Sequence, residues 1–205
     1  SDLHFIFPAV YEYIRLKLNI PSRVPIVNYS ALKIFKTLSG VLGANPKDLK
    51  EINGIGDNNI FGLKIAQAVA RRFLAEGIIN KDFIRSSDEV LKYLKYNLRD
   101  KNREIFLIIY LNGRNQILKM EEIFEGTLST TAVYPREVVK RALDNNAAAL
   151  IFVHNHPSGN PNPSSDDLTI TKKLKEAAKS IDISVHDHLI IAGDEIYSFA
   201  DHEIL

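Results

Sequence analysis

The chain has 205 residues, of which 45% are hydrophobic and 25% are charged, a balance typical of a globular protein with one or two domains. It contains no cysteine, which excludes disulfide bonds and thiolate metal sites, and its longest apolar runs are too short to cross a bilayer. Residues 1–80 carry ten Lys and Arg against six Asp and Glu, whereas residues 86–205 carry fourteen against eighteen, so the charge predicts two parts with different roles.

The first 80 residues are expected to form a small all-α domain. Apolar residues recur at helical spacing over 8–19 and over 28–40, where Gly40 is expected to close the helix. Residues 45–77 predict a short helix, a glycine-containing hairpin and a longer helix. These residues contain no run of alternating apolar and polar residues, so we expect no strand among them.

The hairpin sequence "EINGIGDNN" places two glycines around one apolar residue, just before a helix. Glycines at such a turn let backbone N–H groups approach a partner, and the start of the following helix favours an anion. The segment resembles the helix-hairpin-helix module, which holds DNA by its phosphates, and it would do so here through residues 51–72. A plain helix connector is the alternative, because Asp57, Asn58 and Asn59 stand where a phosphate binder prefers lysine. The expected contacts are Gly54, Ile55, Gly56 and Lys64, with charge added by Arg71 and Arg72.

A linker with a connecting helix is expected over residues 81–102. Ser86 and Glu89 form a capping-box pattern that predicts a helix over about 87–98. The composition then changes, because apolar strand-like runs and helical patterns alternate from residue 103 to the end. Residues 103–205 are therefore expected to form a second domain.

The second domain is predicted to be α/β, with a mixed sheet flanked by helices. Its first two strands form a hairpin around an Asn-Gly turn at 112–115. The predicted elements are strands over 103–111 and 116–124, a helix over 135–146, a buried strand over 147–153, a helix from Ser164 or Ser165 to about 180, and strands over 183–193 and 196–199.

The end of the buried strand carries two histidines, in the sequence "VHNHPSGNPNPSSDDLTI". His154 and His156 are two residues apart, so an extended chain points both rings the same way. Asp166 and Asp167 then stand in the first turn of the next helix. Two histidines and one carboxylate leave a zinc coordination position open for water, which is the catalytic pattern. A polar loop that happens to contain histidine is the alternative.

The spacing His-x-His, seven residues, Ser-x-x-Asp resembles the JAMM or MPN+ motif of zinc metallopeptidases and deubiquitinating enzymes. The resemblance implies that His154, His156 and Asp167, rather than Asp166, bind one zinc ion per chain, although such a ligand set also suits other divalent ions. It further implies a glutamate as general base on an upstream strand, and Glu104 stands where the family has it. The other candidates for the base are Glu121, Glu122 and Glu125.

Residues 126–171 and the segment "HDHLIIAG" closely resemble the RadC-like family, which has been labelled a DNA repair family. The resemblance covers nearly the whole chain and implies a helix-hairpin-helix segment joined to a JAMM-type domain with a layering like that of cytidine deaminases. It implies metal-assisted hydrolysis of a peptide or isopeptide bond, with Glu104 moving the proton and Ser164 binding the developing oxyanion.

Asp187 and His188 are neighbours on a predicted strand, so their side chains point to opposite faces. One of them is expected either to orient a ligand histidine or to belong to a buried pair that the backbone satisfies. Asn155 and Ser158 are expected only to shape the loop.

Three functions remain open from the sequence. The first is a zinc hydrolase acting on a peptide or protein. The second is a DNA-binding adaptor whose metal site is not catalytic, and the third is a metal-dependent nuclease, because the letters "HNH" stand at 154–156. We expect a cytoplasmic protein without a membrane partner, since the chain does not open with a leader pattern.

Overall fold

The computed structural model describes residues 29–99, 101–126 and 133–205, and it divides into two compact units between Ala68 and Val69. The division falls within helix α5 (Asp57–Ile78), which contributes to both units. The helix expected over 8–19 lies outside the described residues.

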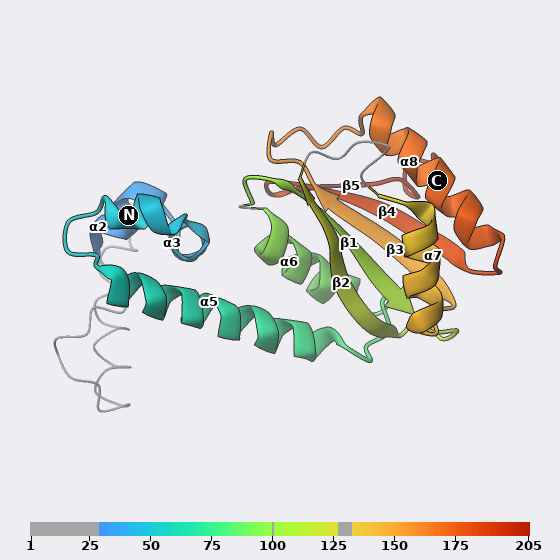
Figure 1. Ribbon diagram of the computed structural model, residues 1–205, viewed down its shortest axis with the longest axis horizontal. Coiled ribbons are helices and arrows are strands. Elements are labelled where there is room, and N and C mark those ends of the chain that lie inside the picture. The colour runs from blue at the N-terminus through green and yellow to red at the C-terminus, as the bar shows by residue number, and fades with distance from the viewer. Residues whose placement is uncertain (1–28, 100, 127–132) are drawn as a thin grey trace. The chain divides into compact units, whose positions relative to one another are not determined.

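The helical unit contains α2 (Tyr29–Phe35), α3 (Leu38–Gly43), α4 (Pro46–Lys50) and the first half of α5 (Figure 1). In the described residues these helices enclose a small apolar core, as the sequence predicts for an all-α segment. The buried core side chains are Ala31, Val41, Leu49, Ile52, Ile55, Ile60 and Leu63.

The prediction of one helix over 28–40 was wrong, because the chain forms two short helices there. Lys36 has a φ of 65°, which ends α2, and the side chain of Thr37 accepts a hydrogen bond from the Gly40 N–H at 2.9 Å, which starts α3. Gly40 therefore lies inside α3. A Cβ at this position would lie 2.5 Å from the carbonyl oxygen of Phe35, so the glycine permits a close approach rather than ending a helix.

The second unit contains one mixed sheet of five strands in the order β2-β1-β3-β4-β5, as the predicted fold class requires. β1 pairs antiparallel with β2 and β3, β3 pairs parallel with β4, and β4 pairs antiparallel with β5. The bounds are α6 (Ser87–Leu98), β1 (Glu104–Leu111), β2 (Ile117–Gly126), α7 (Pro135–Asp144), β3 (Ala149–Asn155), α8 (Ser165–Lys179), β4 (Ser184–Ala192) and β5 (Glu195–Ser198).

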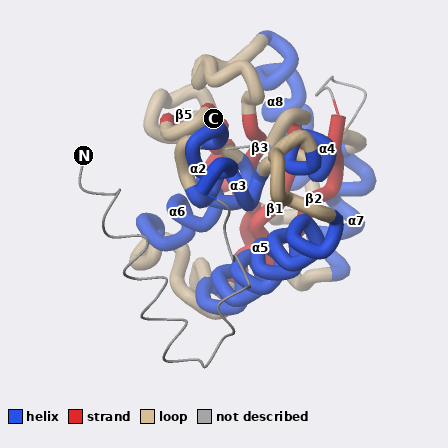
Figure 2. The backbone as a smooth tube through the Cα atoms, turned by 90° about the vertical axis from the view of Figure 1, so that its left-hand side faces the viewer, coloured by secondary structure: helices blue, strands red, loops and turns tan. Residues whose placement is uncertain are grey.

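Helices cover both faces of the sheet. The side of α6 that carries Val90 and Leu94 packs on one face of the central strands, whereas α7 and α8 pack on the other face through residues such as Val138 and Ile170. Figure 2 shows α6 and α7 on opposite sides of the strands. The central strands are buried on both faces, which explains why their sequences are continuous apolar runs rather than alternating ones.

The capping box predicted for α6 is absent from the structure, although the helix itself was correctly predicted. Ser86 precedes α6 without a side-chain capping bond, and the carboxylate of Glu89 pairs instead with the ammonium group of Lys81. A complete capping box occurs at α8. There the Ser164 hydroxyl accepts from the Asp167 N–H, and the Asp167 carboxylate accepts from the Ser164 N–H.

Candidate metal centre

The end of β3 and the start of α8 bring together His154, His156 and Asp167. His154 is the penultimate residue of β3, His156 follows the strand, and Asp167 stands in the first turn of α8. Since α8 connects the parallel strands β3 and β4, its first turn lies at the edge of the sheet where β3 ends (Figure 1).

The donor atoms of these three residues have the spacing of a tetrahedral metal site. Nε2 of His154 lies 3.0 Å from Nε2 of His156 and 3.1 Å from Oδ1 of Asp167, while Nε2 of His156 lies 3.4 Å from Oδ2 of Asp167. Ligand atoms at the corners of a zinc tetrahedron are about 3.3 Å apart, because each lies about 2.0–2.2 Å from the ion. The residues therefore fit zinc, and this group could bind a metal ion.

The loop after β3 fixes the ring of His156. Its Nδ1 lies 2.7 Å from the carbonyl oxygen of Asn160, which can only accept a hydrogen bond. Nδ1 therefore carries a proton, so that in the neutral ring the lone pair is on Nε2, which faces His154 and Asp167. This is the tautomer that a metal ligand needs.

His188 supports His154 from β4. Its Nε2 lies 2.8 Å from Nδ1 of His154, and its Nδ1 lies 2.6 Å from the hydroxyl of Thr171 on α8. The ring is fully buried and contacts Phe106, Phe152 and Phe199. Burial, with the charge of His154, lowers the pKa of His188 well below its usual value, so the ring is neutral.

The electrostatics of the site favour a carboxylate beside the two imidazoles. Burial alone would raise the pKa of Asp167, but hydrogen bonds with His154, His156 and Ser164 and the charge of His154 outweigh it and hold that pKa well below its usual range. The hydrogen bond with Asp167 is the main reason that the pKa of His156 is raised, and the charge of Glu104 adds to it. The site therefore presents negative charge to a cation.

The two aspartates of "SSDD" have different environments. Asp167 is buried and faces the histidines, whereas Asp166 is exposed. Ser164 holds the Asp167 carboxylate, since its N–H donates to Oδ2 at 2.7 Å and its hydroxyl donates to the same oxygen at 2.6 Å. The hydroxyl proton thus points to the Asp167 carboxylate in this structure.

Glu104 lies on the same face of the sheet as His154, at the edge where the site is. Phe106 pairs with His154, and Glu104 stands two residues earlier on β1, so both side chains share that face. The other glutamates lie elsewhere. Glu122 and Glu125 pair with the residues of β1 that face α6, and Glu121 accepts from the hydroxyl of Tyr110 and from Arg141.

The expectation that Asn155 only shapes the loop was wrong. Asn155 is the last residue of β3 and is buried. Its Oδ1 accepts from the Ile105 N–H at 2.8 Å, and its Nδ2 donates to the Arg103 carbonyl at 3.1 Å. The side chain thus continues the pairing of β3 with β1, and its two hydrogen bonds hold the backbone on both sides of Glu104.

Asp187 lies apart from the metal ligands. Its carboxylate accepts from the backbone N–H groups of His188 and Ala200 and from the hydroxyl of Ser198. These bonds tie β4 to the end of β5. Burial raises the pKa of Asp187, against the effect of these hydrogen bonds.

Of the residues predicted to contact DNA, Gly54, Ile55 and Gly56 lie between α4 and α5 in the helical unit, and Lys64 lies on α5. Gly54 has a φ of 87°, while Ile55 is buried in the core of the unit. The ammonium group of Lys64 donates to the carbonyls of Leu42 at 2.8 Å and Ala44 at 2.6 Å, at the end of α3. DNA binding through residues 51–72 stays a prediction, and its signature would be retention on DNA that falls steeply with salt.

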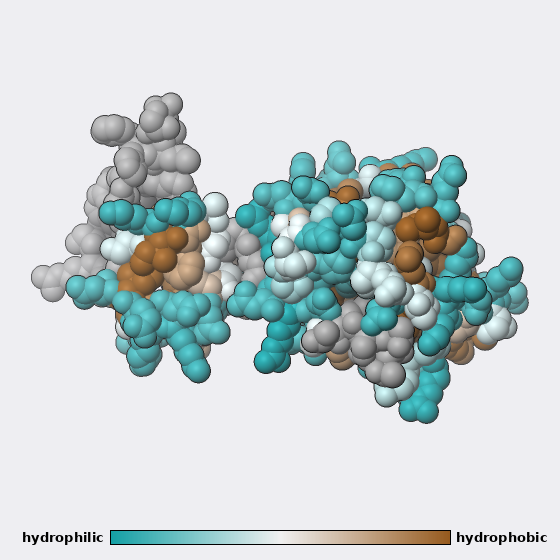
Figure 3. All heavy atoms as spheres, turned by 90° about the horizontal axis from the view of Figure 1, so that it is seen from above, coloured by the Kyte–Doolittle hydropathy of each residue, from teal (hydrophilic) through white to brown (hydrophobic). Residues whose placement is uncertain are grey.

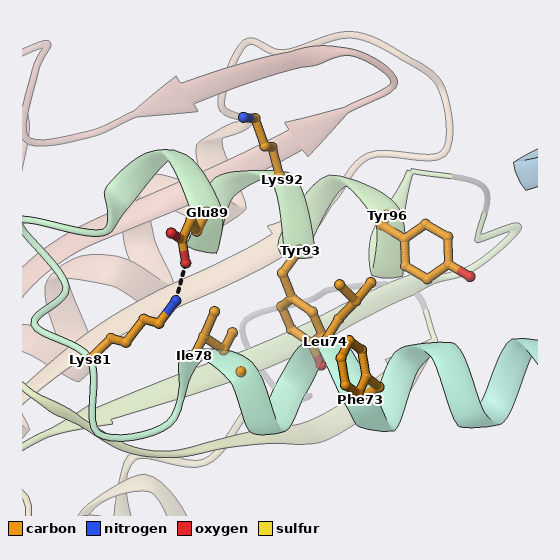
Figure 4. Close-up of a pocket in the computed structure, with 9 residues that line it drawn as sticks. Phe73, Leu74, Ile78, Lys81, Glu89, Lys92, Tyr93 and Tyr96 are labelled. Carbon is orange, nitrogen blue, oxygen red and sulfur yellow. Dashed lines mark hydrogen bonds and ion pairs between the residues drawn. The ribbon is translucent and has the colours of Figure 1, made fainter.

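A groove of about 400 Å³ lies between the end of α5 and α6, apart from these ligands (Figure 4). Phe73, Tyr93 and Tyr96 form much of its wall, and the ion pair of Lys81 with Glu89 crosses one end. The face seen in Figure 3 is mostly hydrophilic, with separate hydrophobic areas. Among the described residues, no helix combines the length and the apolar character that a membrane crossing needs.

Known proteins resemble this chain over its sheet unit and beyond. A family model described as the RadC-like JAB domain matches residues 84–204. The chain belongs to the RadC-like JAB domain family. The RadC-like chain is 42% identical to a UPF0758 protein of Aliivibrio salmonicida, over 83% of its own length and 76% of the relative. It is also 42% identical to a UPF0758 protein of Herminiimonas arsenicoxydans, over 82% and 75%, and 37% identical to one of Pasteurella multocida, over 85% and 78%.

Sequence reasoning missed two residues that hold the site of this RadC-like domain together, Asn155 and Thr171. The position of Asn155 between the two histidines indicates that it belongs to the motif, but it does not indicate what the side chain binds. Thr171 stands four residues after Asp167, one helical turn along α8, so its side chain lies on the same side of the helix. This four-residue spacing is the feature of the sequence that could have identified Thr171.

Proposed function

We propose that this RadC-like protein is a zinc-dependent hydrolase of peptide or isopeptide bonds. The observation that carries the proposal is the convergence of Nε2 of His154, Nε2 of His156 and the two carboxylate oxygens of Asp167, close enough together to hold one ion. These three residues would hold the ion and leave a position open for the reaction. Zinc in such a site supplies Lewis acidity for polarising a carbonyl group and for activating water.

Glu104 would act as the general base. It would take the proton of the attacking water and later deliver it to the leaving amine, which requires a carboxylate on the face of the sheet that carries His154. The hydrogen bonds of Asn155 with the backbone of Ile105 and Arg103 would keep that carboxylate in place.

Ser164 would bind the developing oxyanion by its hydroxyl. The same hydroxyl donates to Oδ2 of Asp167 in this structure, so its single proton would turn from the carboxylate toward the substrate oxygen during the reaction. The Ser164 N–H would go on holding the carboxylate.

The test begins with the zinc content of the full chain and of His156→Ala, measured by elemental analysis. We expect about one zinc per chain in the first and none in the second. Labelled peptide and isopeptide substrates are then compared with plasmid DNA, using Glu104→Gln as the control that keeps zinc and loses hydrolysis. Cutting of plasmid DNA would favour a nuclease, and zinc binding without any hydrolysis would favour the DNA-binding adaptor.

A further inference from the structure

A chain of hydrogen bonds runs from the backbone of α8 to the ring of His154. The hydroxyl of Thr171 donates to the carbonyl oxygen of Asp167 at 2.5 Å and lies 2.6 Å from Nδ1 of His188. Nε2 of His188 lies 2.8 Å from Nδ1 of His154. All four residues are buried, so solvent does not compete for these bonds.

The direction of each bond follows from what each atom can donate. A carbonyl oxygen only accepts, so the one hydrogen of the Thr171 hydroxyl points to Asp167. The hydroxyl oxygen then accepts from Nδ1–H of His188. A neutral His188 with its proton on Nδ1 has a lone pair on Nε2, and that lone pair accepts from Nδ1–H of His154. In a neutral His154 the lone pair is then on Nε2, which faces His156 and Asp167.

We propose that Thr171 and His188 are positioning residues that fix His154 in the tautomer required of a metal ligand. The inference rests on the proposed function, since it concerns the same zinc site. Thr171 donates to the carbonyl of Asp167, so the chain of bonds also links the β3 ligand His154 to the α8 ligand Asp167. The hydrogen bonds through His188 of β4 thereby keep His154 and Asp167 at a fixed distance from each other.

Thr171 offers a matched pair of variants. Thr171→Ser keeps the hydroxyl, whereas Thr171→Val keeps the shape and removes it. Zinc dissociation constants are measured by competition with a chelator for the full-length wild-type protein and both variants. We expect Thr171→Val to weaken zinc binding by about 10-fold, the lower end of the usual effect of losing an outer partner of a metal ligand, because Thr171 acts on His154 through His188. Thr171→Ser should remain within about 3-fold of wild type.

The tautomers provide a readout that a purely structural role of Thr171 would not move. Nitrogen-15 NMR of the histidine rings, recorded with and without zinc, should show protonated Nδ1 in both His154 and His188 of the wild-type protein and of Thr171→Ser. In Thr171→Val, His188 loses the acceptor that selects Nδ1–H, and we expect a mixture of its two tautomers.

His188→Phe is the second variant, because a phenyl ring retains the contacts with Phe106 and Phe152 but can accept no hydrogen bond from His154. We expect a folded variant with weaker zinc binding, and some loss of unfolding free energy because the buried Nδ1–H of His154 loses its acceptor. Equal zinc affinity in wild type, Thr171→Val and Thr171→Ser, or Nε2–H on His188 of the wild type, would overturn the positioning role alone. A wild-type protein that binds no zinc would overturn the proposed function itself, even where the tautomers are as expected.

Discussion

Asp166 and Asp167 are neighbours in sequence and differ completely in burial and contacts. Asp167 is 2% exposed and lies within hydrogen-bond distance of both histidines, whereas Asp166 is exposed. We therefore expect Asp167→Ala to lose its bound zinc and Asp166→Ala to keep about one ion per chain. Elemental analysis of the two purified variants measures this, and an equal loss from both would mean that Asp167 is not the specific ligand.

Asn155 replaces a step of strand pairing with its side chain. Truncation in Asn155→Ala leaves the Ile105 N–H and the Arg103 carbonyl without these partners at the end of β1. We expect a loss of about 1–3 kcal/mol in unfolding free energy, the usual result of leaving a buried polar group unpaired. Urea unfolding gives the value, with exposed Asn162→Ala as the control. A loss of unfolding free energy equal to that of Asn162→Ala would show that the two hydrogen bonds of Asn155 do not contribute to stability.

At the level of elements, the turn between α4 and α5 depends on the backbone of Gly54. Its φ of 87° lies in the left-handed region, where a residue with a Cβ costs about 1–2 kcal/mol. A methyl group added at Gly62, inside α5, would meet no heavy atom of a neighbouring element within 4 Å. Gly54→Ala should therefore destabilise the helical unit, while Gly62→Ala should stabilise it by about 0.5–1 kcal/mol.

Hydrogen exchange of amides in residues 29–68 distinguishes these two effects from changes in the sheet unit. If both substitutions shift the exchange rates in the same direction, the positive φ of Gly54 does not determine the stability of the helical unit. The Gly54→Val and Gly56→Val pair, tested on a DNA column with the sheet unit still folded, then examines the predicted DNA contact separately.

Glu121 ties the edge strand β2 to α7 through Arg141 and to β1 through Tyr110. Burial opposes its ionisation, but hydrogen bonds from Lys119 and Tyr110 and the charge of Arg141 prevail, so the pKa of Glu121 is below its usual 4.5. A lowered folded pKa stabilises the fold above the unfolded value, and this contribution is lost as the pH falls through the folded pKa.

We therefore expect wild type to exceed Glu121→Gln in stability by about 0.5–1 kcal/mol at pH 7. The difference should shrink progressively below pH 4.5. Urea midpoints across pH 3–7 test this, and a difference that is independent of pH would contradict it.

Apolar runs allowed the strands to be predicted within a few residues, since a strand buried on both faces contains little else. The spacing of His154, His156 and Asp167 likewise predicted the group that the fold brings together. The break at Lys36 could not be predicted, because a left-handed lysine depends on how α3 packs. The partners of Asn155 and Thr171 depend on strand order and pairing, which the local sequence does not contain.

At the scale of the whole molecule, the three residues that could hold a metal ion all belong to the sheet unit. Zinc at 100 times its dissociation constant should stabilise that unit by about 2.7 kcal/mol, because only the folded site binds it. Hydrogen exchange of β3 and β4 with zinc and with a chelator measures the effect, and exchange in residues 29–68 should not change. Loss of the protection in His156→Ala would assign it to this site, whereas its persistence would place the ion elsewhere.

The position of the ligands along the chain has a consequence for the order of assembly. Residues 154–167 leave the ribosome before β4 does, and closing so short a loop costs little entropy. His188, 34 residues after His154, arrives only when β4 pairs with β3. An ion captured by the nascent chain would therefore template the docking of β4, and insertion of His188 would be the late step that slows release of the ion.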